Sequence, residues 1–270
     1  MSGFSEILAA VTPRDRHDAV DAEKARAQSI CMPEGELERM GAVRALRQDE
    51  TCTREEFRVL KRHLMARIRM APSGLDPRVI LVTSASPGEG KTTVALGLAV
   101  SFMLERDCRV VLIDADVRTC ELTHRMKLSR EPGLLDYLDD ESLELRDVLY
   151  PTSTPGISAV PTGQPRVTAP ELLSNPRLGR FLHELRLSND QTIAIIDSSS
   201  VLSCSETVSL ASHAGQILFV TAKDQTRRRD VDEGLAILHR GAGPLDEARI
   251  ALVLNKADRG QSPVRYAARR

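Results

Sequence analysis

The residues best suited to chemistry form a glycine-rich stretch, ASPGEGKT, at positions 85–92. Gly88 and Gly90 allow backbone conformations that turn several N–H groups toward one point. A helix beginning near Lys91 adds the positive end of its dipole. Lys91 is placed to reach the β- and γ-phosphates of a nucleotide, and the Thr92 hydroxyl to ligate Mg²⁺. The spacing is that of a P-loop with alanine at its first position. Nucleotide contacts are expected from Pro87, Gly88, Glu89, Gly90, Lys91, Thr92 and Thr93.

Acidic residues follow two further apolar runs. Residues 109–113 lead into Asp114 and Asp116, whose period-two spacing puts both carboxylates on one side of an extended chain. Such a pair beside a phosphate makes sense if Mg²⁺ neutralises it, or if one carboxylate accepts a proton from an attacking hydroxyl. Residues 192–196 end in Asp197, the Walker B form, which holds Mg²⁺ directly or through water. The predicted metal ligands are Thr92, Asp114 and Asp197.

The last apolar run ends in Asn255-Lys256-Ala257-Asp258, the pattern that reads guanine in many GTPases. A GTPase also carries Asp-x-x-Gly after its Walker B strand, whereas Asp197 is followed by three serines. We therefore expect Asn255 near the base edge of the nucleotide, with adenine favoured over guanine.

The elements that must position these residues alternate along the chain. Apolar runs predict strands, and amphipathic patterns between them predict helices. The expected strands are 79–83, 109–113, 157–160, 192–196, 216–221 and 250–254, and the expected helices are 54–70, 92–105, 177–187, 206–213 and 227–240. This order predicts an α/β P-loop NTPase, a mostly parallel sheet with helices on both faces. The predicted organisation is a weakly ordered extension (1–50), a kinase or ATPase domain (51–258) and a flexible basic tail (259–270).

Composition limits the function classes. The chain has 270 residues, 41% of them hydrophobic, and a formal net charge of −1. Five Phe, three Tyr and no Trp provide few stacking platforms, so we expect no nucleic-acid partner. No apolar run approaches the roughly 20 residues of a membrane span, and the start of the chain lacks the pattern of a secretory signal. These features predict a cytoplasmic location.

Several stretches, in order, resemble the bacterial tyrosine kinases, and within them the exopolysaccharide- and exosortase-associated tyrosine autokinases. The stretches are EEFRVLKRHL, SASPGEGKTTVALGLAVSF, VVLIDADVR, EPGLLDYL, ISAVPTGQPRVTAPELLSNPRLGRFLHEL and AGQILFVTAKDQT. The resemblance covers residues 54–258. It implies a protein-tyrosine kinase that binds ATP and Mg²⁺ and regulates exopolysaccharide biosynthesis. The catalytic residues it implies are Lys91, Asp114 and Asp116, with Asp114 or Asp116 helping to deprotonate the tyrosine hydroxyl.

The resemblance also implies partners. A membrane-embedded polysaccharide chain-length regulator would activate the protein and hold it at the inner face of the membrane. Relatives oligomerise through a Glu-x-x-Arg-x-x-Arg helix, which Glu55, Arg58 and Lys61 match with lysine in the last place. Lysine cannot form the two-pronged contact of arginine, which weakens this interface. Simple packing of the helix on the sheet is the alternative.

Two features depart from the family. Its Walker B aspartate is usually followed by Thr or Ser and two prolines, but serines occupy positions 198–200 here. The tail carries a single candidate phosphoacceptor, Tyr266, in place of a tyrosine cluster. Tyr137 and Tyr150 look structural. A nucleotide-binding regulatory module with little kinase activity is therefore the second hypothesis. A MinD/ParA-like ATPase is the third, and Ser86 stands against it where those proteins carry a signature lysine.

Overall fold

A computed structural model describes residues 51–70, 74–105, 108–188, 191–242 and 249–257. The predicted extension 1–50 and tail 259–270, which includes Tyr266, lie outside the described residues. The domain limits of 51 and 258 therefore stay predictions.

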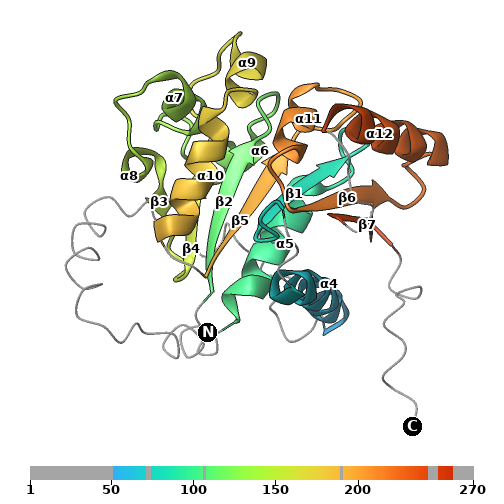
Figure 1. Cartoon of the computed structure of the whole chain (residues 1–270). Helices are drawn as coiled ribbons and strands as arrows, with labels where there is room; N and C mark the ends of the chain where they lie inside the picture. Colours follow the sequence, from blue (N-terminus) through green and yellow to red (C-terminus); the bar gives the residue numbers. More distant parts are fainter. Residues whose placement is uncertain (1–50, 71–73, 106–107, 189–190, 243–248, 258–270) are drawn as a thin grey trace.

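Within the described residues, seven strands form one sheet in the order β3-β4-β2-β5-β1-β6-β7 (Figure 1). They are β1 (Val79–Ser84), β2 (Arg109–Ala115), β3 (Tyr150–Pro151), β4 (Ile157–Val160), β5 (Thr192–Ser198), β6 (Gln216–Ala222) and β7 (Ile250–Asn255). All neighbouring pairs are parallel except the edge pair β3–β4. The six predicted strands and the fold class are confirmed. β3 was not predicted, because two residues that include a proline carry no strand pattern.

Nine described helices surround the sheet. They are α4 (Thr51–Met70), α5 (Lys91–Met103), α6 (Glu121–Arg125), α7 (Leu134–Asp139), α8 (Leu145–Val148), α9 (Ala169–Leu173), α10 (Arg177–Ser188), α11 (Glu206–Ala211) and α12 (Arg228–Gly241). The predicted helices correspond to α4, α5, α10, α11 and α12. The other four span only four to six residues each, too short for a periodic pattern to reveal them.

The core lies on both faces of the sheet, which explains why the strands are apolar at consecutive positions. On β1, Ile80 and Val82 pack in a cluster with side chains of α4, α5 and α6. Leu81 points the other way, into a cluster built mainly from α7 and α9 to α12. Figure 1 shows the result as three layers, with helices in front of and behind the sheet.

The strand order creates a crevice at one edge of the sheet. β1 lies between β5 and β6, and β5 is followed in the chain by β6 on the opposite side of β1. Ligands of open α/β sheets bind beyond the carboxyl ends of the strands at such a point. The glycine-rich stretch follows β1, and the predicted acidic residues stand at the ends of β2 and β5.

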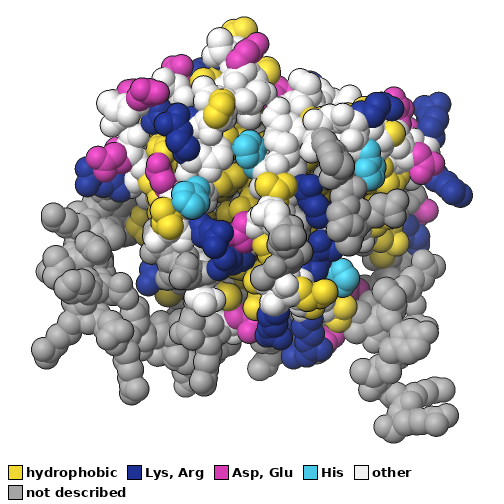
Figure 2. Space-filling model, in the orientation of Figure 1, with side chains coloured by type: hydrophobic (Ala, Val, Ile, Leu, Met, Phe, Trp, Pro, Cys, Tyr) yellow, Lys and Arg dark blue, Asp and Glu magenta, His cyan; other side chains and the backbone are white. Residues whose placement is uncertain are grey.

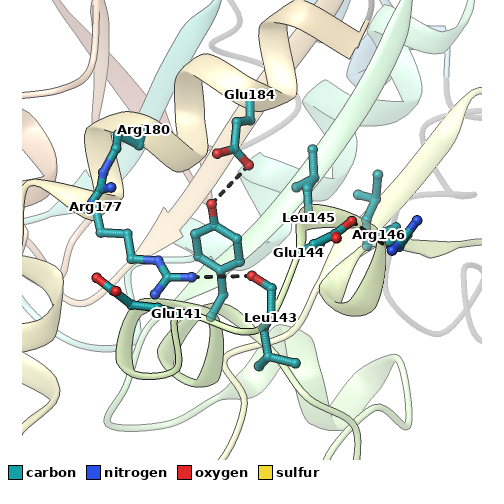
Figure 3. Close-up of a pocket in the computed structure, with 10 residues that line it drawn as sticks. Glu141, Leu143, Glu144, Leu145, Arg146, Arg177, Arg180 and Glu184 are labelled. Carbon is teal, nitrogen blue, oxygen red and sulfur yellow. Dashed lines mark hydrogen bonds and ion pairs between the residues drawn. The ribbon is translucent and has the colours of Figure 1, made fainter.

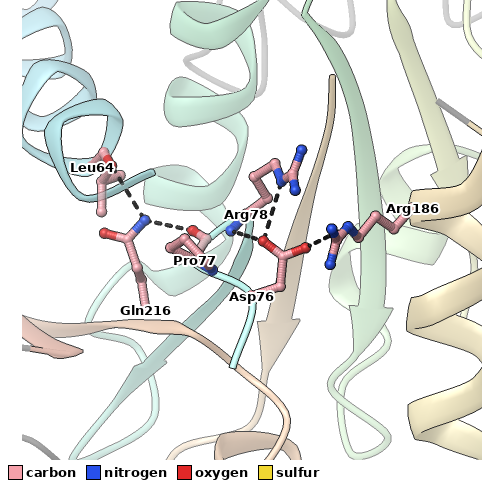
Figure 4. Close-up of polar contacts among 6 residues, drawn as sticks. All are labelled: Leu64, Asp76, Pro77, Arg78, Arg186 and Gln216. Atoms are coloured by element: carbon pink, nitrogen blue, oxygen red, sulfur yellow. Dashed lines mark hydrogen bonds and ion pairs between the residues drawn. The ribbon is translucent and has the colours of Figure 1, made fainter. Parts of the chain in front are cut away.

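Polar and apolar contacts hold helix α4 against this core, and Figure 4 shows the polar contacts around Gln216. The buried amide of Gln216 donates from Nε2 to the backbone oxygens of Leu64 (3.3 Å) and Pro77 (2.6 Å). A side chain at Gly97 of α5 would place its Cβ 2.2 Å from the ring of Phe57, so glycine allows the two helices to approach closely. These contacts establish the packing role that the sequence left open for this helix.

Charge on the described surface is mixed. On the face seen in Figure 2, basic and acidic side chains are interspersed among hydrophobic ones. None of the described helices is both long enough and apolar enough to cross a membrane.

Candidate functional site

The glycine-rich stretch forms a tight loop between β1 and α5. Gly88 and Gly90 have φ angles of +79° and +95°, in the left-handed region that favours glycine. Gly90 has a second constraint, because a Cβ there would lie 2.0 Å from the side-chain nitrogen of Asn255. The predicted loop therefore has the backbone conformations that its glycines imply, and α5 begins directly after it at Lys91.

Glu89 organises the loop from inside. Its carboxylate is fully buried and accepts a hydrogen bond from the Ser86 backbone N–H at 2.8 Å. It also accepts a bond from the hydroxyl of Thr226, which lies just beyond β6. Glu89 thus contributes its backbone to the loop surface, while its side chain braces the loop against the β6–α12 connection.

The end of β7 braces the same loop. Asn255 donates from Nδ2 to the Glu89 carbonyl at 2.9 Å, and Lys256 donates from Nζ to the Gly88 carbonyl at 2.7 Å. Lys256 also bonds the side chain of Gln225 at 2.8 Å. Asn255 was predicted at the base edge of a nucleotide, but its amide nitrogen is engaged by the loop backbone. In this structure Asn255 supports the phosphate loop.

The three predicted carboxylates lie together at the ends of β2 and β5. Asp114 and Asp197 are directly opposite each other in the strand register, and both side chains are fully buried. Asp116 is 6% exposed and lines a cavity of about 300 Å³ in front of the loop. The remaining lining residues are Pro87, Gly88, Gly90, Lys91, Thr92, Thr93, Arg118, Thr119, Glu121, Arg125, Ser199, Ser200, Ser203 and Lys256.

Asp114 accepts two backbone hydrogen bonds, from the N–H groups of Asp116 (3.1 Å) and Thr123 (2.7 Å). Burial nevertheless raises the pKa of its carboxyl from 3.8 to about 6, because removal from water outweighs the lowering effect of these bonds. The negative charge of Asp116 adds to the rise.

Asp197 is different, because neither carboxylate oxygen has a hydrogen-bond partner among the described residues. Burial raises the pKa of this carboxyl well above its ordinary value, and the charge of Asp114 reinforces the shift. The nearby Thr92 hydroxyl and the positive charge of Lys91 act in the opposite direction, although Thr92 does not reach the geometry of a full hydrogen bond to Asp197. A fully buried acid with two unsatisfied oxygens beside a phosphate loop is the electrostatic environment that a cation would relieve.

The described tyrosines lie outside this site. Tyr137 borders a separate, larger cavity of about 680 Å³, where Arg177 of α10 donates a hydrogen bond to the backbone oxygen of Leu143 at 3.3 Å (Figure 3). Its hydroxyl donates to Glu184 at 2.9 Å, and the Arg177 guanidinium lies 4.5 Å from its ring centre.

Tyr150 is engaged as well. Its hydroxyl donates to the backbone oxygens of Pro132 and Asp147, each at 3.1 Å. Burial is the main cause that raises the pKa of this hydroxyl to about 12. Both described tyrosines therefore have structural contacts.

The predicted oligomer helix is α4. Arg58 is exposed and pairs with Glu55 one turn away at 2.9 Å. Lys61 is 7% exposed and pairs within the chain with Glu105 at 2.5 Å. Lys61 thus belongs to the α4–α5 contact, while Glu55 and Arg58 lie at the surface.

Sequence reasoning missed several residues of this site. Thr226 and Ser199 touch the loop or its carboxylates but belong to no motif that marks them as functional, and Lys256 touches the loop although no role was predicted for it. Their contacts connect positions 83 to 168 residues apart. The Asn-Lys-x-Asp pattern was the one signal that pointed toward Lys256.

The fold and the site together define a class. An α/β domain with a P-loop after an interior strand of its sheet, and carboxylates at the ends of nearby strands, is a P-loop nucleotide-binding domain. Residues 80–265 match the family described as the CobQ/CobB/MinD/ParA nucleotide binding domain. The chain belongs to this family.

Individual relatives bear tyrosine-kinase names. The chain is 32% identical over 173 residues to EpsB of Ralstonia nicotianae, a match that covers 64% of this chain and 22% of EpsB. It is 25% identical over 187 residues to the tyrosine-protein kinase CpsD of Streptococcus agalactiae, covering 69% of this chain and 78% of CpsD. The kinase domain of the Escherichia coli tyrosine kinase ETK superposes with a TM-score of 0.60 at 26% identity, over 72% of this chain and 73% of that domain. The expected resemblance to bacterial tyrosine kinases is confirmed.

Proposed function

We propose that this chain is an ATP-dependent protein-tyrosine autokinase that regulates exopolysaccharide biosynthesis. The observation that carries the proposal is the juxtaposition of two unlike carboxylates beside the phosphate loop. Asp197 is buried with no partner, as suits a cation ligand, and Asp116 faces the cavity, as suits a proton acceptor. The tyrosine-kinase names of EpsB, CpsD and ETK support transfer to tyrosine.

The nucleotide would be ATP, held by the backbone of the loop and by Lys91. Thr92, Asp114 and Asp197 would hold Mg²⁺. The described residues contain no group of three or more His, Cys, Asp or Glu able to bind a metal alone. A cation would therefore take its remaining ligands from the nucleotide and water. When bound, Mg²⁺ neutralises charge on the phosphates.

The transfer step assigns different tasks to Asp114, in β2, and Asp116, just beyond it. Asp116 lines the cavity and would accept the proton of the tyrosine hydroxyl as its oxygen attacks the γ-phosphorus. The bond from that phosphorus to the β–γ bridging oxygen breaks, and ADP leaves with the electron pair. Asp114 does not line the cavity and fits the metal side of the site. Lys91 would stabilise the charge that develops on the phosphates.

The partners complete the proposal. The phosphoacceptor would be Tyr266, since Tyr137 and Tyr150 are both engaged. The surface pair Glu55 and Arg58 would contact a second copy of the chain, together with the more buried Lys61. A membrane-embedded chain-length regulator would activate the assembly at the inner face of the membrane.

The test is phosphotyrosine formation by the full chain with Mg²⁺-ATP, with and without the cytoplasmic part of its activator. We expect phosphate on Tyr266 that disappears in Lys91→Met and in Tyr266→Phe. Absence of phosphotyrosine with the activator present would refute the kinase proposal.

The second candidate is a regulatory module that binds ATP and changes its assembly state. The engagement of both described tyrosines favours it, as does the serine run at 198–200 where prolines were expected. ATP binding by calorimetry, together with nucleotide-dependent assembly and no phosphotyrosine, would support this candidate over the kinase.

A further inference from the structure

We propose that Ser199 is a positioning residue that fixes the orientation of the Asp116 carboxylate at the nucleotide cavity. The inference rests on the proposed role of Asp116 in phosphoryl transfer. It adds to that function a residue that no sequence motif identified.

The contact itself is short and buried. The Ser199 hydroxyl donates to Oδ1 of Asp116 at 2.7 Å, and Ser199 is 4% exposed. A hydrogen bond to a charged acceptor is stronger than one between neutral groups, and exclusion of water strengthens it further.

The position of Ser199 is fixed from two directions. Its backbone oxygen accepts hydrogen bonds from the hydroxyls of Thr83 on β1 (2.9 Å) and Thr207 on α11 (3.0 Å). Both threonines are fully buried. Ser199 is therefore an anchored donor, since its backbone cannot follow a movement of the Asp116 side chain without breaking these bonds.

The other described hydrogen bonds to the Asp116 carboxylate come from its own turn. Oδ1 accepts from the N–H groups of Arg118 (3.2 Å) and Thr119 (3.3 Å), and Oδ2 accepts from the Thr119 hydroxyl (2.9 Å). These donors would move with the turn. Ser199 is the donor that comes from a distant segment, directly after β5, so it ties the turn after β2 to the end of β5.

The family resemblance led us to expect proline at position 199, and proline could not make the hydrogen bond that Ser199 makes to Asp116. Proline has no side-chain donor and acts by restricting the backbone. In this chain a hydrogen bond, rather than a stiff backbone, would define the geometry between the two acidic strand ends.

The test compares Ser199→Ala with the matched variant Ser209→Ala, a serine-to-alanine change in α11 away from the cavity. We expect Ser199→Ala to lower kcat for phosphoryl transfer about tenfold, the scale of one hydrogen bond to a charged group. KM for ATP should stay within about twofold. Ser199→Thr, which keeps the hydroxyl, should recover most of kcat, and Ser209→Ala should match the unmodified protein.

A double variant tests whether Ser199 acts through Asp116. In an Asp116→Asn background, Ser199→Ala should change the residual kcat little, because the group it orients is already altered. Full additivity of the two losses would overturn the proposal. So would phosphoserine at position 199, since a hydroxyl bonded to a base is also the geometry of a nucleophile.

An activity-independent measurement separates this inference from the kinase proposal. Hydrogen exchange of the Arg118 and Thr119 amides should be faster in Ser199→Ala than in Ser209→Ala, because the shared acceptor is released. Unchanged exchange and unchanged kcat would overturn the inference and leave the kinase proposal standing. Faster exchange with no phosphotyrosine in any variant would uphold the positioning role and refute the kinase.

Discussion

Replacing Gly90 by alanine separates two physical reasons for glycine in the phosphate loop. Gly90 has a φ of +95°, which strains any residue with a Cβ, and that Cβ would lie 2.0 Å from Nδ2 of Asn255. Gly88 offers a matched control. Its φ is +79°, but the nearest atom to its added Cβ is Nε2 of Gln225 at 3.5 Å, an ordinary contact.

The magnitudes follow from these contacts. The left-handed backbone costs an alanine about 1–2 kcal/mol at either position, partly offset by about 0.5 kcal/mol from a less flexible unfolded chain. Only at Gly90 must Asn255 also move, which breaks its 2.9 Å bond to the Glu89 carbonyl. That loss adds about 1–2 kcal/mol. Gly90→Ala should therefore destabilise the protein by about 1–2 kcal/mol more than Gly88→Ala.

The assay is urea unfolding of the nucleotide-free protein followed by far-UV circular dichroism, since the chain has no tryptophan. A second comparison isolates the clash. In an Asn255→Ala background, the difference between Gly90→Ala and Gly88→Ala should vanish. Equal losses for the two glycine variants with Asn255 intact would refute the reasoning.

Three further predictions concern buried polar groups. Asp197→Asn should raise the free energy of unfolding without nucleotide by about 1–3 kcal/mol at pH 8, because it removes a buried carboxylate with no partner. Because the pKa of Asp197 is raised in the folded state, its ionised carboxylate lowers the stability of the protein at pH values above the ordinary pKa of 3.8. The stability advantage of Asp197→Asn should therefore shrink as the pH falls through the raised pKa toward 3.8. Urea unfolding at several pH values checks this, and an advantage that grows on acidification would contradict it. Gln216→Leu should cost about 2 kcal/mol in thermal unfolding and speed hydrogen exchange in α4, since the Leu64 oxygen loses its donor; an unchanged α4 would contradict it. Thr226→Val removes the hydroxyl that braces Glu89 and should weaken ATP binding about fivefold by calorimetry, whereas unchanged affinity would make that bond dispensable.

The sequence predicted the parts of this protein that local patterns encode. Six buried strands were visible as apolar runs, because a parallel sheet covered on both faces needs apolar residues at successive positions. The loop from Gly88 to Lys91 was visible because its conformation requires particular residue types at fixed spacing. The short helices α6 to α9 were not visible, since they are stabilised by their neighbours and carry too few residues for a period.

The sequence by itself also determined that Asp114, Asp116 and Asp197 stand at strand ends beside a phosphate loop. The sequence did not show which of these three carboxylates has hydrogen-bond donors and which has none. Strand order and register put Asp114 opposite Asp197, brought Ser199 to Asp116, and left Asp197 without a donor. Only the tertiary structure decided these differences, because whether a buried carboxylate is satisfied depends on donors that approach from strands and loops distant in the chain.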